Sequence, residues 1–128
     1  AIRGVVSNCA HPSQTAVLAG LKHPEYKAQH ATKVETLKGR AQKAIQVLAK
    51  PEYKDEFEMY PFNSGYFLCL KLANVEAEKL RVHLLDKYGV GTISAGTYDL
   101  RIAFSCIAEK DIEELFSIIY KGCKDLNN

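Results

Sequence analysis

A long helical repeat is the feature that most constrains how this chain folds. Between Pro24 and Pro51 there is no proline, and residues suited to packing recur at alternating steps of four and three positions: His30, Val34, Leu37, Ala41, Ala44 and Leu48. This repeat predicts an amphipathic helix from Glu25 to Ala49 with one packed face. At roughly 1.5 Å per residue it would reach about 40 Å, so we expect a strut that joins parts of a small protein.

Shorter elements surround this helix. Before it, Pro12 suits the first turn of a helix that runs to about Leu21. After Pro51 the patterns predict a short strand at 57–61, a central strand at 65–72 with both faces buried, a helix at 75–88 that Asn74 caps and Gly89 ends, strands at 90–94 and 100–106, and a helix at 109–124. In the first of these later helices, Ala77, Leu80, Leu84 and Leu85 form the apolar stripe.

This order of elements predicts an α+β fold with two layers: a small, mostly antiparallel sheet, helices packed on one side of it, and a long N-terminal helix. We expect two parts, residues 1–24 as an interdomain segment with a short helix and residues 25–128 as a small domain led by the long helix. The chain begins at Ala1. We therefore expect it to be a piece of a longer protein.

Charge and apolar runs exclude some functional classes. Lys and Arg total 17 against 15 Asp and Glu, which argues against a surface built for nucleic acid or membranes. The longest apolar run, Tyr66 to Leu70, is too short to span a bilayer, so we expect a soluble, cytoplasmic protein. The Cys and His residues are too dispersed to predict a metal site or a redox motif, and we expect buried free thiols.

Arg101 is the residue with the clearest chemical role. If residues 100–105 form a strand, its side chains alternate between the two faces of the sheet. Leu100, Ile102 and Phe104 then lie on one face, and Arg101, Ala103 and Ser105 on the other. A guanidinium between two small side chains leaves space for a ligand, and its planar fork of donors fits a carboxylate. The alternative is a solvated arginine on an open sheet face.

Three segments together resemble a known family. They are Asn63-Ser64-Gly65-Tyr66-Phe67, Gly89-Val90-Gly91 after a helix, and Leu100-Arg101-Ile102-Ala103-Phe104-Ser105. In this order they resemble the C-terminal domain of class I/II aminotransferases of the aspartate aminotransferase fold. The resemblance implies the small C-terminal domain of the fold-type I pyridoxal-phosphate-dependent transferases.

The resemblance also implies roles for three residues. Arg101 matches the arginine that holds the substrate α-carboxylate, and Phe67 matches an aromatic position at the site wall, with a core phenylalanine as the alternative. Arg3, in Arg3-Gly4-Val5-Val6-Ser7-Asn8, matches an arginine that reaches across the dimer to a distal carboxylate. The chain departs from that pattern afterwards, with Cys9 and Ala10 where the family usually has prolines.

The activity implied for the longer parent is transfer of an amino group between an amino acid and a 2-oxo acid, in a homodimer that uses pyridoxal 5'-phosphate. The family's cofactor lysine and other cofactor-binding residues match nothing in this chain, so we expect the chain alone to bind no cofactor and to be inactive. No catalytic residue and no metal ligand is assigned. The alternatives are a lyase or decarboxylase of the same fold and a stand-alone, non-catalytic α+β module that binds amino acids or organic acids for regulation.

Overall fold

The computed structural model describes residue 4 and residues 10–62 and 65–127. The chain divides into two compact units, Ala1–Glu35 and Thr36–Asn128, and the division falls inside one long helix. The predicted boundary at residue 24 stays a prediction, as the two units do not test it.

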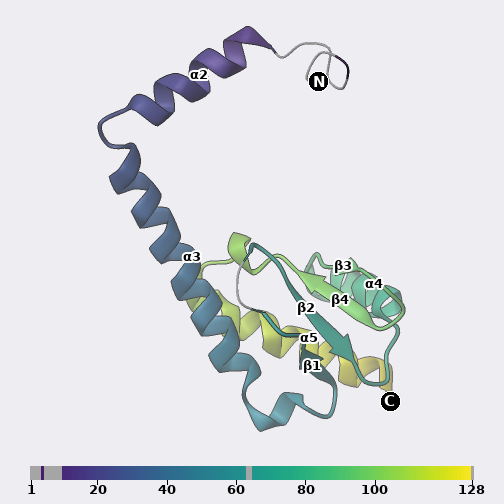
Figure 1. The fold of residues 1–128 in the computed structure, drawn as a ribbon. Helices are drawn as coiled ribbons and strands as arrows, with labels where there is room; N and C mark the ends of the chain where they lie inside the picture. Colours follow the sequence, from purple (N-terminus) through teal and green to yellow (C-terminus); the bar gives the residue numbers. More distant parts are fainter. Residues whose placement is uncertain (1–3, 5–9, 63–64, 128) are drawn as a thin grey trace. The chain divides into compact units, whose positions relative to one another are not determined.

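The first unit contains helix α2 (His11–Lys22) and the beginning of helix α3 (Tyr26–Leu48) (Figure 1). Pro12 lies in the first turn of α2, as predicted from its fixed φ and missing N–H. No residue of α2 is buried, and Val17, Leu18 and Leu21 are each more than half exposed. The predicted bounds of the long helix, Glu25 to Ala49, each lie one residue outside the observed bounds of α3.

The second unit is built on a four-stranded antiparallel sheet in the order β1-β2-β4-β3. Its strands are β1 (Phe57–Met59), β2 (Leu68–Leu72), β3 (Ile93–Ser94) and β4 (Asp99–Ile102). Helices α4 (Ala77–Tyr88) and α5 (Ile112–Asn127) cover one face of this sheet (Figure 1). The predicted α+β fold with an antiparallel sheet is confirmed.

One hydrophobic core fills the space between the sheet and the helices. Strands supply Leu70, Leu100 and Ile102, and the helices supply an apolar stripe in which Leu80, Leu84, Ile112, Phe116 and Ile119 are fully buried. Ala44 and Val47 join this core from the second half of α3. The part of the predicted α3 repeat that lies in the second unit is therefore packed, whereas His30 and Val34, in the first unit, are exposed.

Strand β2 is shorter than predicted and has only one buried face. Gly65 has a φ of 102°, a left-handed conformation that strains other residues, and the chain bends there before pairing begins at Leu68. Tyr66 and Phe67 are consequently exposed, and Lys71 is exposed on the outer side of the strand. The prediction of a strand buried on both faces was wrong because the helices cover only one of them.

Helix α4 also differs from its prediction at its start. It begins at Ala77 after Glu76, so Asn74 is not its cap, and Leu85 is 49% exposed and not part of the stripe. Its predicted end is confirmed, because Gly89 adopts a φ of 67° and its N–H bonds to the Leu85 carbonyl.

The thiols are not uniformly buried. Cys123 is buried, Cys69 is half-buried and Cys106 is exposed, while Cys9 lies outside the described residues. The prediction of buried thiols therefore holds for Cys123 and is wrong for Cys106.

Candidate functional site

Strand β4 places Arg101 on the outer face of the sheet. Its neighbours in sequence, Leu100 and Ile102, are buried toward the helices, and alternation turns the Arg101 side chain to the uncovered side, where it is exposed. Because β4 pairs with β2 and β3, Arg101 lies directly opposite Cys69 on one side and Ile93 on the other. The site is thus centred on an inner strand held from both edges.

The predicted neighbours of Arg101 were wrong. The chain leaves the strand after Ile102, and Phe104–Cys106 form a turn of 3₁₀ helix, so alternation does not continue to Ser105. The side chains next to Arg101 are instead its cross-strand partners, half-buried Cys69 and Ile93, which is 46% exposed. The guanidinium therefore has a partly apolar border, which a single strand's pattern could not reveal.

Phe67 covers one face of this guanidinium. The Arg101 carbon Cζ lies 4.8 Å from the centroid of the Phe67 ring, which is a favourable distance for a cation–π contact. With Phe67 48% exposed, the alternative of a core phenylalanine is wrong. Its predicted place in the wall of a site stays a prediction.

The guanidinium of Arg101 forms no hydrogen bond and no ion pair with the described residues. The acidic residue nearest in sequence, Asp99, accepts a hydrogen bond from the Tyr60 hydroxyl at 2.7 Å. This bond is the main cause of the raised pKa of Tyr60. An arginine stacked on one face, with its N–H groups available, can bind a carboxylate through two parallel hydrogen bonds.

A thiol also lies on this face, that of Cys69, directly opposite Arg101. Burial raises the pKa of its thiol, and the neighbouring Asp99 adds to that effect, while Arg101 opposes it. A thiol with a raised pKa remains protonated near neutral pH, so it is a poor nucleophile. The Cys69 thiol is therefore not an activated nucleophile.

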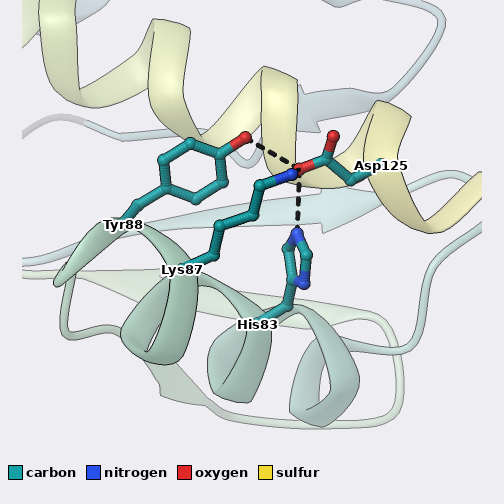
Figure 2. A network of polar contacts seen from close by, with 4 residues as sticks. All are labelled: His83, Lys87, Tyr88 and Asp125. Carbon is teal, nitrogen blue, oxygen red and sulfur yellow. Dashed lines mark hydrogen bonds and ion pairs between the residues drawn. The ribbon is translucent and has the colours of Figure 1, made fainter.

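A polar network connects the ends of α4 and α5 away from Arg101 (Figure 2). One oxygen of Asp125, Oδ2, lies 2.9 Å from His83 Nε2 and accepts hydrogen bonds at 2.7 Å from Lys87 Nζ and from the Tyr88 hydroxyl. These contacts, His83 first, lower the pKa of Asp125. The sequence analysis missed this network, although the spacing of His83 and Lys87 on one helical face was a signal for it.

The lysines of the described residues share one property: none is buried. Ion pairs with Glu113, Asp125 and Glu56 raise the pKa values of Lys50, Lys87 and Lys124, respectively. A lysine that attacks carbonyl groups needs the opposite, a lowered pKa from a desolvating environment. Lys50, Lys87 and Lys124 are therefore not suited to covalent chemistry.

Arg3 lies outside the described residues, so its predicted role stays a prediction. Across the described ranges there is no group of three or more His, Cys, Asp or Glu residues placed to hold a metal ion. None of the helices in these ranges is long and apolar enough to cross a membrane.

A comparison with protein families shows which family this chain belongs to. The profile of the family described as aminotransferase class I and II matches residues 1–119, which include Arg101, Phe67 and the whole sheet. A search of curated proteins found no match for this chain.

Proposed function

Because this chain belongs to the class I and II aminotransferases, we propose that it is the substrate-carboxylate-binding part of an enzyme that transfers an amino group between an amino acid and a 2-oxo acid. Members of this family generally depend on pyridoxal phosphate. In this proposal the chain is the C-terminal small domain of the enzyme, and Arg101 holds the substrate α-carboxylate.

The observation that carries the proposal is the state of the Arg101 guanidinium. It projects from the uncovered face of the sheet, it is stacked on Phe67 at 4.8 Å, and within the described residues no carboxylate neutralises it. An arginine kept only for stability would be expected to pair with an acidic side chain. This one presents its fork to an incoming anion.

The chain's contribution to the reaction is orientation. Two parallel N–H to oxygen bonds fix the carboxylate in the plane of the guanidinium, so they also fix the direction of the adjacent Cα. Holding the reacting carbon in one direction reduces the entropy that must be lost at the transition state. Ile93 and Phe67 border the guanidinium with apolar surface, which limits competing contacts of the carboxylate with water.

The described residues do not fit the cofactor-binding part of the enzyme. The family's imine-forming lysine requires desolvation, and none of the described lysines is buried. We therefore propose that the cofactor is held by residues beyond those described, and that this chain is inactive by itself. The same proposal includes a homodimer, in which Arg3 binds the distal carboxylate of a substrate across the dimer.

The test is a pair of substitutions in the complete enzyme. Arg101→Lys keeps the charge but loses the planar fork of donors. We therefore expect kcat/KM to fall by an amount that corresponds to a loss of about 2 to 4 kcal/mol of transition-state stabilisation. The matched control is Arg81→Lys, since Arg81 lies on α4 and pairs with Glu78. Unchanged kinetics in Arg101→Lys would remove the proposed role.

Calorimetry of the 128-residue chain with aspartate, glutamate and pyridoxal phosphate separates this proposal from a stand-alone binding module. We expect weak or undetectable binding, because the chain supplies one wall of the site. Tight binding of an amino acid by the chain alone would favour the binding module.

A further inference from the structure

We propose that Arg40, on the long helix α3, is a positioning residue for Arg101. Arg40 binds the backbone of Ser105, and Ser105 binds the backbone of Tyr66. These two hydrogen bonds hold the neighbouring Phe67 ring against the Arg101 guanidinium. This inference rests on the proposed function, because it concerns how the carboxylate-binding side chain is held.

The first step concerns what holds Phe67. Pairing between β2 and β4 begins at Leu68, opposite Ile102, so Phe67 lies just outside the ladder of hydrogen bonds. On its other side the chain bends at Gly65, which has a φ of 102°. The segment is tied instead by the residue next to Phe67: the Ser105 N–H donates to the Tyr66 carbonyl at 3.4 Å.

The second step concerns what holds Ser105. Ser105 follows β4 in the 3₁₀ turn Phe104–Cys106, and its carbonyl accepts a hydrogen bond from Arg40 Nη1. One residue earlier, the Phe104 ring is buried and packs edge to face on Phe62 with 5.1 Å between centroids. Ser105 is thus linked by its N–H to Tyr66 and by its carbonyl to Arg40.

The third step concerns the base from which Arg40 reaches. The half-buried Arg40 side chain precedes the part of α3 that enters the core through Ala44 and Val47. On the same part of the helix, Lys43 pairs with Glu113 of α5 at 3.0 Å. The part of α3 that carries Arg40 belongs to the second unit and is fixed there by the core and by α5, so the backbone from which Arg40 reaches Ser105 is held in place.

These steps give Arg40 a functional consequence. A hydrogen bond from a charged donor is stronger than one between neutral groups. Without it, the 3.4 Å hydrogen bond from the Ser105 N–H to the Tyr66 carbonyl loses its support from α3, and the Phe67 ring can move off the guanidinium. Arg101 then samples more rotamers in the absence of ligand, and binding a carboxylate must restrict them again.

The test uses nuclear magnetic resonance on the isotope-labelled 128-residue chain. In the wild type, the Phe67 ring current should shift the side-chain resonances of Arg101, and ring protons should show Overhauser contacts with them. Arg40→Met keeps the length of the side chain but removes the donors, so we expect the shift and the contacts to be lost. Arg40→Lys can donate one bond to the Ser105 carbonyl and should restore part of both.

The matched control is Lys43→Met, one turn along the same helix, which removes the ion pair with Glu113 but no contact of Ser105. It should leave the Arg101 resonances unchanged. If the Arg101 resonances in Arg40→Met had the same chemical shifts as in the wild type, the proposal would be overturned. It would also be overturned if the wild type itself showed no ring-current effect of Phe67 on Arg101. If Lys43→Met had the same effect as Arg40→Met, general loosening of α3 would replace the specific role.

Kinetics of the complete enzyme give the second readout. Arg40→Met should raise KM for the amino acid by up to about fivefold, the upper size of one exposed cation–π contact, with little change in kcat. If the ring-current result holds and KM is unchanged in both Arg40→Met and Arg101→Lys, the proposed function fails and the positioning contact stands. If only Arg101→Lys affects KM, the function stands and the influence of Arg40 on binding is refuted.

Discussion

The Lys124 ammonium lies 2.7 Å from Oε1 of Glu56, a carboxylate that is only 4% exposed. Asn127 donates to the other oxygen, Oε2, at 2.6 Å. Both partners come from the end of α5, so the buried carboxylate fastens that helix to the segment just before β1. A buried carboxylate is costly unless it is paired and hydrogen-bonded, so these contacts allow Glu56 to remain in the interior.

Loss of the lysine should therefore destabilise the fold. We expect Lys124→Met to lower the melting temperature clearly, because Glu56 is left buried with one fewer partner. Lys121→Met, on the same helix with an exposed side chain, should change it little. Thermal unfolding followed by circular dichroism makes the comparison, and equal melting temperatures would contradict it.

Replacement of glycine by alanine should lower stability at Gly122 and raise it at Gly20. A Cβ on Gly122 would lie 2.8 Å from Leu84 Cδ2 and 3.1 Å from Leu80 Cδ1, because α5 crosses α4 closely there. Gly122→Ala should therefore reduce the free energy of unfolding by about 1 to 3 kcal/mol. A Cβ on Gly20 in α2 would meet no atom of the described residues within 4 Å, so Gly20→Ala should raise local helix stability by about 0.5 to 1 kcal/mol.

Chemical denaturation for Gly122→Ala and amide exchange in α2 for Gly20→Ala provide these measurements. A neutral Gly122→Ala would mean that the leucines repack around the added methyl group.

The Asp125 network predicts a dependence of stability on acid. Its pKa in the folded protein lies below the ordinary value of 3.8, so its contribution is present above that pH and is lost as the pH falls below it. Asp125→Asn should melt at a lower temperature than the wild type at neutral pH, and the difference should shrink between pH of roughly 4 and 2. A constant difference across this range would argue against the network.

Removal of the Phe67 ring should weaken carboxylate binding. In the complete enzyme, Phe67→Leu should raise KM for the amino acid by roughly twofold to fivefold, as expected for one exposed cation–π contact. The neighbouring Tyr66 is 59% exposed, and Tyr66→Leu serves as the control with no expected change. Equal effects in the two variants would show that the ring acts through bulk apolar surface.

The sequence predicted the elements well where a pattern repeats over several turns or ends in a glycine. The α3 repeat and the Gly89 stop of α4 are local signals, and the structure agrees with both. The fold class followed from the order of such elements. Prediction was weaker at strand ends, because Ser105 leaves β4 for a 3₁₀ turn through contacts with Arg40 and Tyr66 that are distant in sequence.

The candidate site was predicted in part for the same reason. Alternation along β4 correctly predicted that the Arg101 side chain lies on one face of the sheet and the Leu100 and Ile102 side chains on the other, since these residues share one strand. Its real neighbours, Cys69 and Ile93, depend on strand order and register, which a single strand cannot reveal. The carboxylate-binding role itself stays a prediction.

The position of α5 affects how this chain can fold during synthesis. Ile112, Phe116 and Ile119 of this helix cover the apolar face that β2 and β4 present. Because α4 is made before β3 and β4, a chain that is complete as far as β4 still leaves uncovered the part of that apolar face on which α5 packs, and chaperones can bind it until α5 has left the ribosome.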